Sequence, residues 1–274
     1  MAEASGHAQT HGDLREVVDA QVEVRRSPSR DAALDTEALK GERVIVHETT
    51  VEGWCRGTLE ADGYVGYVPT SALRDPGPLP THRVAVPRTL VFPGPSIKLP
   101  PCEALSLGCR LAVARSEGPF AVTNAGAYVP ARHLARLDVF AGDPVAVAEQ
   151  FLHVPYLWGG KTSLGLDCSG LVQVALTACS VPCPRDSHMQ EAALGAPIAD
   201  IPDVADLKRG DLLFWRGHVA IARDQRTLIH ANAFHMAVAI EPIAQALARI
   251  SASGSALTSV RRIDAQGGTL SLVP

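Results

Sequence analysis

The chain of 274 residues contains no long apolar run and no strong excess of one charge. No stretch reaches the roughly 18 consecutive apolar residues that a membrane-spanning helix requires, so we expect no membrane span. The formal net charge is −4 at pH 7, which gives no electrostatic reason to bind nucleic acid or an anionic membrane. What is left is a globular protein with 46% apolar and 20% charged residues, long enough for several small domains.

The first residues lack the pattern of a secretory signal. Residues 1–12 are polar and contain no basic segment followed by an apolar one. We therefore expect a disordered tail over residues 1–13 and a cytoplasmic protein.

Cysteine pairs with the spacing of a metal site are also missing. Cys179 and Cys183 are not spaced as Cys-X-X-Cys, and the other cysteines are scattered. The sequence therefore predicts reduced, mostly buried thiols and no structural zinc. The six cysteines are Cys55, Cys102, Cys109, Cys168, Cys179 and Cys183.

Two consecutive segments, residues 14–76 and 77–138, consist of short β-prone runs with polar or glycine-containing breaks. A glycine-led run (41–46 and 108–113) and a closing Gly-Tyr-Val-Pro or Gly-Ala-Tyr-Val-Pro (66–69 and 126–130) occur in both. The proline-rich residues 75–80 separate the segments. We predict a duplicated small β-barrel, and the pattern resembles bacterial SH3 (SH3b) domains. The expected strands are 22–24, 43–47, 54–59 and 64–68, then 84–86, 90–92, 110–114, 120–123 and 127–129.

Residues 139–274 change from predicted helices to predicted strands. Helical spacing of apolar residues occurs over 144–153, and an apolar helix is expected over 169–179. Helices followed by antiparallel strands predict an α+β domain. The expected strands are 212–215, 219–223, 227–230, 236–240 and 259–263.

Cys168 stands where the second of these helices begins. Asp167 can cap that helix, and the helix N-terminus favours the thiolate, which is the nucleophilic form of cysteine. His218 starts one predicted strand and His230 ends the next, so adjacent antiparallel strands would bring the two rings together. This arrangement predicts Cys168 as nucleophile, His218 as general base and His230 as the residue that orients His218.

Six short motifs surround these residues in a fixed order. They are Pro-Tyr-Leu-Trp-Gly-Gly (155–160), Asp-Cys-Ser-Gly-Leu (167–171), Pro-Arg (184–185), Leu-Lys-Arg-Gly-Asp-Leu (207–212), His-Val-Ala-Ile (218–221) and Ile-His-Ala (229–231). In this order they resemble the NlpC/P60 family of cell-wall cysteine peptidases, over about residues 144–263. The resemblance implies a papain-like fold, a triad of Cys168, His218 and His230, and cleavage between γ-D-glutamate and a diamino acid. It implies no metal and no organic cofactor.

The two barrels in front of this domain resemble the γ-D-glutamyl-L-diamino acid endopeptidases that act on free murein peptides. That resemblance implies a substrate of the form L-Ala-γ-D-Glu-diamino acid, with Asp167 facing the free ammonium group of the alanine. Tyr156 would donate a hydrogen bond to the oxyanion, beside the Cys168 N–H. Glu60, in the first barrel, is a candidate second acidic contact. The remaining candidate substrate contacts are Trp158, Ser169, Arg185 and Ser187.

Other interpretations stay open at this point. Tyr156 and Trp158 could be core residues, Asp167 a helix cap only, and Arg185 part of a surface ion pair. The whole chain could be a non-catalytic module that binds wall peptides, although the intact Cys–His–His set argues against this. It could also be an acyltransferase or amidase on the same scaffold, because residues alone do not give the acyl acceptor.

Overall fold

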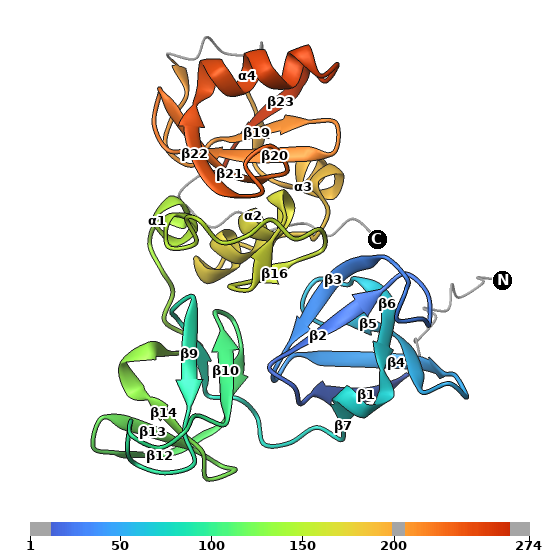
Figure 1. Ribbon diagram of the computed structural model, residues 1–274, viewed down its shortest axis with the longest axis vertical. Coiled ribbons are helices and arrows are strands. Elements are labelled where there is room, and N and C mark those ends of the chain that lie inside the picture. Colours follow the sequence, from blue (N-terminus) through green and yellow to red (C-terminus); the bar gives the residue numbers. More distant parts are fainter. Residues whose placement is uncertain (1–11, 199–205, 264–274) are drawn as a thin grey trace, which may run out of the picture.

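The computed structural model describes residues 12–198 and 206–263 (Figure 1). Most of the expected N-terminal tail lies outside the described residues, and Asp13 already begins the first strand. The described chain forms two β-rich units, one blue and one green in Figure 1, beside a domain of mixed helices and strands. No helix among the described residues is long and apolar enough to span a membrane.

The first unit is a seven-stranded antiparallel sheet in the order β3-β2-β6-β5-β4-β1-β7. Alternate apolar side chains of its strands, such as Val22, Val24 and Val44, form its core. All four predicted strands are present. Its strands are β1 (Asp13–Val17), β2 (Gln21–Arg25), β3 (Leu34–Leu39), β4 (Arg43–Thr49), β5 (Trp54–Leu59), β6 (Val65–Pro69) and β7 (Leu73–Arg74).

The sequence analysis missed β3 for a physical reason. Asp35 and Glu37 lie within it, and carboxylates are depleted in strands. Glu37 is nevertheless buried, because its carboxylate accepts a hydrogen bond of 2.8 Å from the Lys161 N–H of the third unit. The strand therefore turns polar side chains toward a neighbouring domain, which local sequence does not reveal.

The second unit consists of three small sheets around one core. In each of the first two units a strand ends at a proline, Pro69 or Pro130, and a 3₁₀ turn follows, η1 (Thr70–Ala72) or η2 (Ala131–His133). The strands β10 and β15 were not predicted. The strands are β8 (His82–Val84), β9 (Arg88–Val91), β10 (Glu103–Ser106), β11 (Arg110–Leu111), β12 (Val113–Glu117), β13 (Phe120–Thr123), β14 (Tyr128–Pro130) and β15 (Leu134–Arg136).

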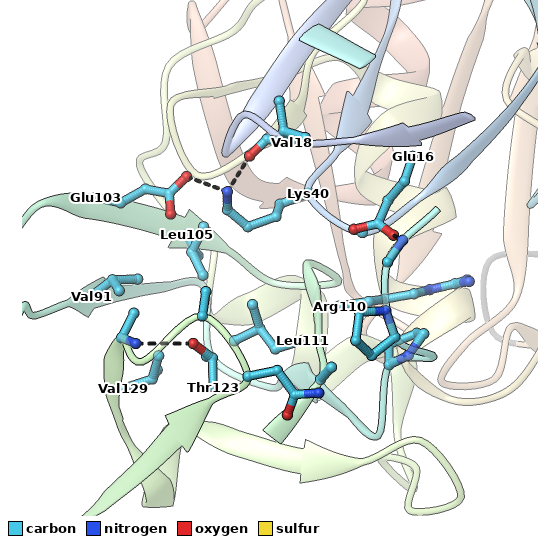
Figure 2. Close-up of a pocket in the computed structure, with 18 of the residues that line it drawn as sticks. Glu16, Val18, Lys40, Val91, Glu103, Leu105, Arg110, Leu111, Thr123 and Val129 are labelled. Atoms are coloured by element: carbon cyan, nitrogen blue, oxygen red, sulfur yellow. Dashed lines mark hydrogen bonds and ion pairs between the residues drawn. The ribbon is translucent and has the colours of Figure 1, made fainter. Parts of the chain in front are cut away.

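A hollow of about 460 Å³ lies between the first and second units (Figure 2). An ion pair crosses it, with 2.9 Å between Lys40 Nζ and Glu103 Oε1. Nearby, Gly41 has φ +77°, and a Cβ there would approach the Arg110 carbonyl oxygen to 2.4 Å, so only glycine fits. The residues that line the hollow include none of the predicted site residues, so this space belongs to the joint between the barrels.

The third unit is an α+β domain, as predicted, and it has three layers. A six-stranded antiparallel sheet, in the order β18-β23-β19-β20-β21-β22, has α1 and α2 on one face and α4 on the other (Figure 1). Its helices are α1 (Pro144–Glu149), α2 (Cys168–Ala178), α3 (Ser187–Ala193) and α4 (Ile243–Ala252). The strands of this sheet are β18 (Ala196–Pro197), β19 (Leu212–Trp215), β20 (His218–Ala222), β21 (Thr227–Asn232), β22 (Ala237–Pro242) and β23 (Leu257–Arg262). A separate hairpin pairs β16 (Lys161–Thr162) with β17 (Gly165–Leu166).

Side-chain alternation along the strands divides the core into two parts. In β19, Leu212 and Phe214 pack in the cluster that contains α2, whereas Leu213 and Trp215 pack in the cluster that contains α4. Because both faces are covered, β19 is a continuous apolar run, Leu-Leu-Phe-Trp, and every residue in it is buried. The sequence analysis missed α3 and α4.

Buried polar contacts hold the first barrel against the third unit. The Lys161 ammonium group lies 3.3 Å from a Glu42 oxygen, and both side chains are less than a tenth exposed. Gln173 of α2 donates a hydrogen bond of 2.8 Å to Asp62. These contacts fix the first barrel beside the N-terminal part of α2.

The Lys161–Glu42 pair gives a prediction about stability. Substitution Glu42→Gln leaves the Lys161 ammonium buried without its counter-charge, so we expect the free energy of unfolding to fall by about 3 kcal/mol. Urea unfolding followed by circular dichroism measures this loss. Glu60→Gln is the matched control, because Glu60 is exposed and an exposed charge contributes little to the free energy of unfolding. Equal stabilities of the two variants would contradict the prediction.

Candidate active site

Cys168 is the first residue of α2, and Asp167 caps that helix. The Asp167 carboxylate accepts a hydrogen bond of 2.7 Å from the Gly170 N–H. A Cβ at Gly170 would lie 2.2 Å from the Gly160 carbonyl oxygen, so the glycine lets the loop pack directly on the helix. The cysteine is thereby held, 8% exposed, at the helix N-terminus that the sequence predicted.

An arginine buried behind the cysteine organises this turn. Arg185 is 1% exposed, and its guanidinium group makes two hydrogen bonds to the Asp167 carboxylate, of 2.9 and 2.8 Å. It also donates to the Ser169 hydroxyl at 2.9 Å and, across the domain boundary, to the Thr36 hydroxyl at 2.8 Å. Arg185 is therefore part of a buried ion pair rather than a surface one.

Two histidines on adjacent strands form the other half of the site. His218 begins β20 and His230 lies in β21, with 2.9 Å between His218 Nε2 and His230 Nδ1. Val219, one residue after His218, belongs to the same buried cluster as Cys168, and its N–H lowers the pKa of the thiol. The thiol thus lies against the start of β20, and His230 lies behind His218, 1% exposed.

Burial makes neutral forms of the thiol and the imidazole favourable. Burial and the charge of Asp167 raise the pKa of Cys168 to about 12. The Val219 and Ser169 N–H groups and the charge of Arg185 lower it, but by less. Burial also lowers the pKa of His218 to about 3, assisted by His230 and Arg249. The helix terminus was expected to favour a thiolate, but here desolvation outweighs it.

A cavity of about 230 Å³ opens beside the sulfur. Of the predicted substrate contacts, Tyr156, Trp158, Asp167, Ser169 and Ser187 line it. Burial raises the pKa of Tyr156 to about 12, so its hydroxyl keeps its proton as a hydrogen-bond donor.

The structure does not bring two predicted contacts to this cavity. Arg185 lies buried behind Asp167, and Glu60 is an exposed residue outside the lining. The Asp167 carboxylate accepts five hydrogen bonds, from Gly159 and Gly170 N–H, the Ser169 hydroxyl and two Arg185 nitrogens. Its charge is therefore already balanced by Arg185.

The first barrel contributes residues to the cavity that the sequence analysis missed. Arg26, Asp35 and Tyr64 lie in its wall, together with Asp186 from the third unit. Arg26 pairs with Asp35 at 2.7 Å, and the Tyr64 hydroxyl donates to Asp186 at 3.4 Å. Asp186 could have been found, since it stands between two residues that were singled out. Nothing in the sequence marks Asp35 or Tyr64, because barrel and domain meet only in the tertiary structure.

One cluster has donors that a metal ion could use. The ligand atoms of His230, His235 and Glu241 lie within 4.8 Å of one another. However, the Glu241 carboxylate is also hydrogen bonded to the Arg249 guanidinium, whose positive charge opposes a cation at the same oxygen. The donors fit a hydrogen-bond network better than a metal site.

Two family models match the chain. Residues 24–73 match the bacterial dipeptidyl-peptidase SH3 domain, and residues 153–250 match the NlpC/P60 family. The crystal structure of an NlpC/P60 family protein from Bacillus cereus superimposes with a TM-score of 0.76, at 20% identity, and covers 91% of this chain and 99% of that one. This likeness is one of fold.

Relatives with known names match shorter parts. Dipeptidyl-peptidase 6 of Lysinibacillus sphaericus is 38% identical over 102 residues, which is 37% of this chain and 36% of that protein. The gamma-D-glutamyl-L-lysine dipeptidyl-peptidase of Bacillus subtilis is 29% identical over 200 residues, which is 68% of this chain and 65% of that protein. The chain thus spans about a third of the first relative and just under two thirds of the second.

A buried cysteine at a helix N-terminus, packed in one cluster with the antiparallel strand that His218 begins, is the arrangement of the papain-like class of cysteine peptidases. Within that class, residues 153–250 are an NlpC/P60 domain, and an SH3 domain of the bacterial dipeptidyl-peptidase type lies in front of it at residues 24–73.

The pKa directions predict how thiol reactivity depends on pH. Because the pKa of Cys168 is raised and that of His218 is lowered, the thiol is protonated and the imidazole neutral throughout the neutral range. We expect the alkylation rate of Cys168 by iodoacetamide to rise continuously up to about pH 9, the upper end of the range in which ordinary thiols titrate. Mass spectrometry of the peptide that contains Cys168 separates this rate from that of other thiols. A rate that is already constant from acidic pH upward would indicate a preformed thiolate–imidazolium pair instead.

Proposed function

We propose that the protein hydrolyses the amide bond between γ-D-glutamate and a diamino acid in peptides derived from peptidoglycan. The observation that supports this most directly is the cavity beside Cys168, one wall of which comes from the SH3 domain. Two relatives are named as gamma-D-glutamyl-L-lysine dipeptidyl-peptidases, from Bacillus subtilis and Bacillus cereus. A lysine or another diamino acid then follows the scissile bond.

The proposed reaction proceeds by acyl transfer. Cys168 attacks the γ-carbonyl carbon of the glutamate, and its proton passes to His218 as the carbon–sulfur bond forms. The Cys168 N–H and the Tyr156 hydroxyl stabilise the oxyanion. His218 then protonates the leaving amine, and the carbon–nitrogen bond breaks to give a thioester. His218 next takes a proton from water, whose oxygen attacks the thioester carbon. The carbon–sulfur bond then breaks to release the acid, and His218 returns the proton to the sulfur.

The far wall of the cavity supplies charges for a short peptide with a free amino terminus. Burial, together with the charges of Asp186 and Asp35, raises the pKa of Tyr64 to about 12, and all three residues line the cavity. An ammonium group here would be bound by Asp186, since the charges of Asp167 and Asp35 are balanced by Arg185 and Arg26. Arg26 offers the opposite charge, which suits the free carboxylate of a γ-linked glutamate.

Because the SH3 domain forms this wall, the cavity suits the end of a peptide better than the middle of a cross-linked strand. A place in the recycling of wall peptides within the cytoplasm follows as part of the proposal. The acyl acceptor in this proposal is water. An amine acceptor would make the protein an acyltransferase, and analysis of the products distinguishes the two reactions.

Hydrolysis of defined peptides tests the proposal. We expect rapid cleavage of L-Ala-γ-D-Glu-L-Lys or its meso-diaminopimelate analogue, measured by mass spectrometry. Acetylation of the alanine should slow the reaction at least 100-fold, because the hydrogen bond to the charged ammonium group is lost and the carboxylate that made it is left unpaired. Cys168→Ala removes the nucleophile and should abolish both reactions. Equal cleavage of free and acetylated peptides would keep the peptidase and reject recognition of the ammonium group. Binding without cleavage by the wild type would reject the peptidase itself.

Recognition of the ammonium group gives a separate prediction. Asp186→Asn should lower kcat/KM for the free peptide by about 10- to 100-fold, the loss expected for a hydrogen bond to a charged group. The slow cleavage of the acetylated peptide should not change. Glu60→Gln is the control, because it removes a carboxylate of the same barrel outside the cavity. A control as impaired as Asp186→Asn would show a general charge effect and contradict specific binding.

A further inference from the structure

Glu241 contacts the far side of His230. Its Oε1 atom lies 2.8 Å from His230 Nε2, and the same oxygen accepts a hydrogen bond from Arg249 of α4. His230 alternates in β21 with Ile229 and Ala231, which pack toward α2, so its ring lies on the sheet face that α4 covers. Glu241 reaches it there from β22, as a diagonal neighbour, because His230 pairs with Ala239.

Glu241 is an ionised group in a nearly closed place. Its side chain is 9% exposed. Burial alone would raise the pKa of Glu241. The interactions with His230 and Arg249 lower it by more, so the pKa falls to about 2. With an ionised carboxylate oxygen 2.8 Å away, His230 Nε2 is favoured in its protonated form, because an unprotonated nitrogen would turn its lone pair toward the negative charge.

The ionised Glu241 carboxylate determines which ring nitrogens of His230 and His218 carry a proton. Burial lowers the pKa of His230, so its ring is neutral and carries one proton, on Nε2. Its Nδ1 is then an acceptor, and it lies 2.9 Å from His218 Nε2, which must carry the proton between them. His218 Nδ1 is left without a proton, so it is the nitrogen that can act as the base.

We propose that Glu241 is a positioning residue that sets both histidines in the tautomers that let His218 act as the base for Cys168. The proposal rests on the proposed roles of Cys168 and His218. Arg249 holds the Glu241 carboxylate in place, while its positive charge, with that of His235 when protonated, keeps His230 from taking a second proton. When His218 becomes protonated in the reaction, the carboxylate stabilises that charge through His230.

Two substitutions of similar size separate the acceptor from the charge. Glu241→Met removes the acceptor, so His230 can place its proton on Nδ1 and donate it to His218. That change moves the His218 proton to Nδ1, where it faces the thiol and blocks transfer. We expect alkylation of Cys168 at pH 7 and kcat to fall by about 100-fold or more, with KM little changed. Glu241→Gln keeps an acceptor oxygen for His230 and Arg249, so both rates should stay within about tenfold of wild type.

The readouts do not all need substrate. Nitrogen-15 spectra of the histidine rings should show the His218 proton on Nε2 in the wild type and Glu241→Gln, and on Nδ1 in Glu241→Met. Ile250→Ala is the control for structural damage, since it opens a cavity in α4 packing without touching the histidines. It should lower the melting temperature at least as much as Glu241→Met and leave the alkylation rate unchanged.

Two results would overturn the proposal. One is a Glu241→Met variant with a lowered melting temperature but wild-type alkylation rate and tautomers, which would make Glu241 a structural residue only. The other is a glutamine variant as impaired as the methionine one. Failure of the wild type to cleave any wall peptide, with the alkylation and tautomer differences intact, would reject the proposed substrate and support the role of Glu241.

Discussion

The buried ion pair between Arg185 and Asp167 is the interaction on which the rest of the site depends. It neutralises the carboxylate that caps α2, so the cap can be buried without an unpaired charge. The same guanidinium binds the Ser169 hydroxyl and the Thr36 hydroxyl of the first barrel. One side chain therefore fixes the helix turn that presents Cys168 and the contact that brings the SH3 domain to the cavity.

Burial is the common cause of the chemical properties of this site. It disfavours a charged thiol and a charged imidazole alike, so the Cys168–His218 pair is best described as neutral until a substrate carbonyl is attacked. A neutral pair needs its proton in the right place, because only one ring nitrogen of His218 can accept it. The carboxylate of Glu241, which contacts His230 on the side away from His218, therefore sets the position of the proton on His218.

The SH3 domain has a part in the cavity as well as in the fold. Its strand β3 contains three consecutive polar residues, Asp35, Thr36 and Glu37, because they contact the third unit or line the cavity. Polar residues that would weaken an isolated strand are stable here, because the partner surface supplies their hydrogen bonds. The second barrel lines a different hollow and contributes none of the side chains beside Cys168.

The sequence by itself determined the α+β class and the two β-rich segments, and it predicted Cys168, His218 and His230 as one set, because ordered motifs and local periodicity record them directly. It also predicted five oxyanion or substrate contacts that line the cavity, namely Tyr156, Trp158, Asp167, Ser169 and Ser187. It placed Arg185 and Glu60 at the substrate, where the structure does not bring them. Only the tertiary structure decided the wall formed by Asp35, Tyr64 and Asp186, and the contact of Glu241 with His230. Those contacts join residues from separate strands and domains, and a side chain's hydrogen-bond partner across such a boundary depends on docking and register, which local sequence does not encode.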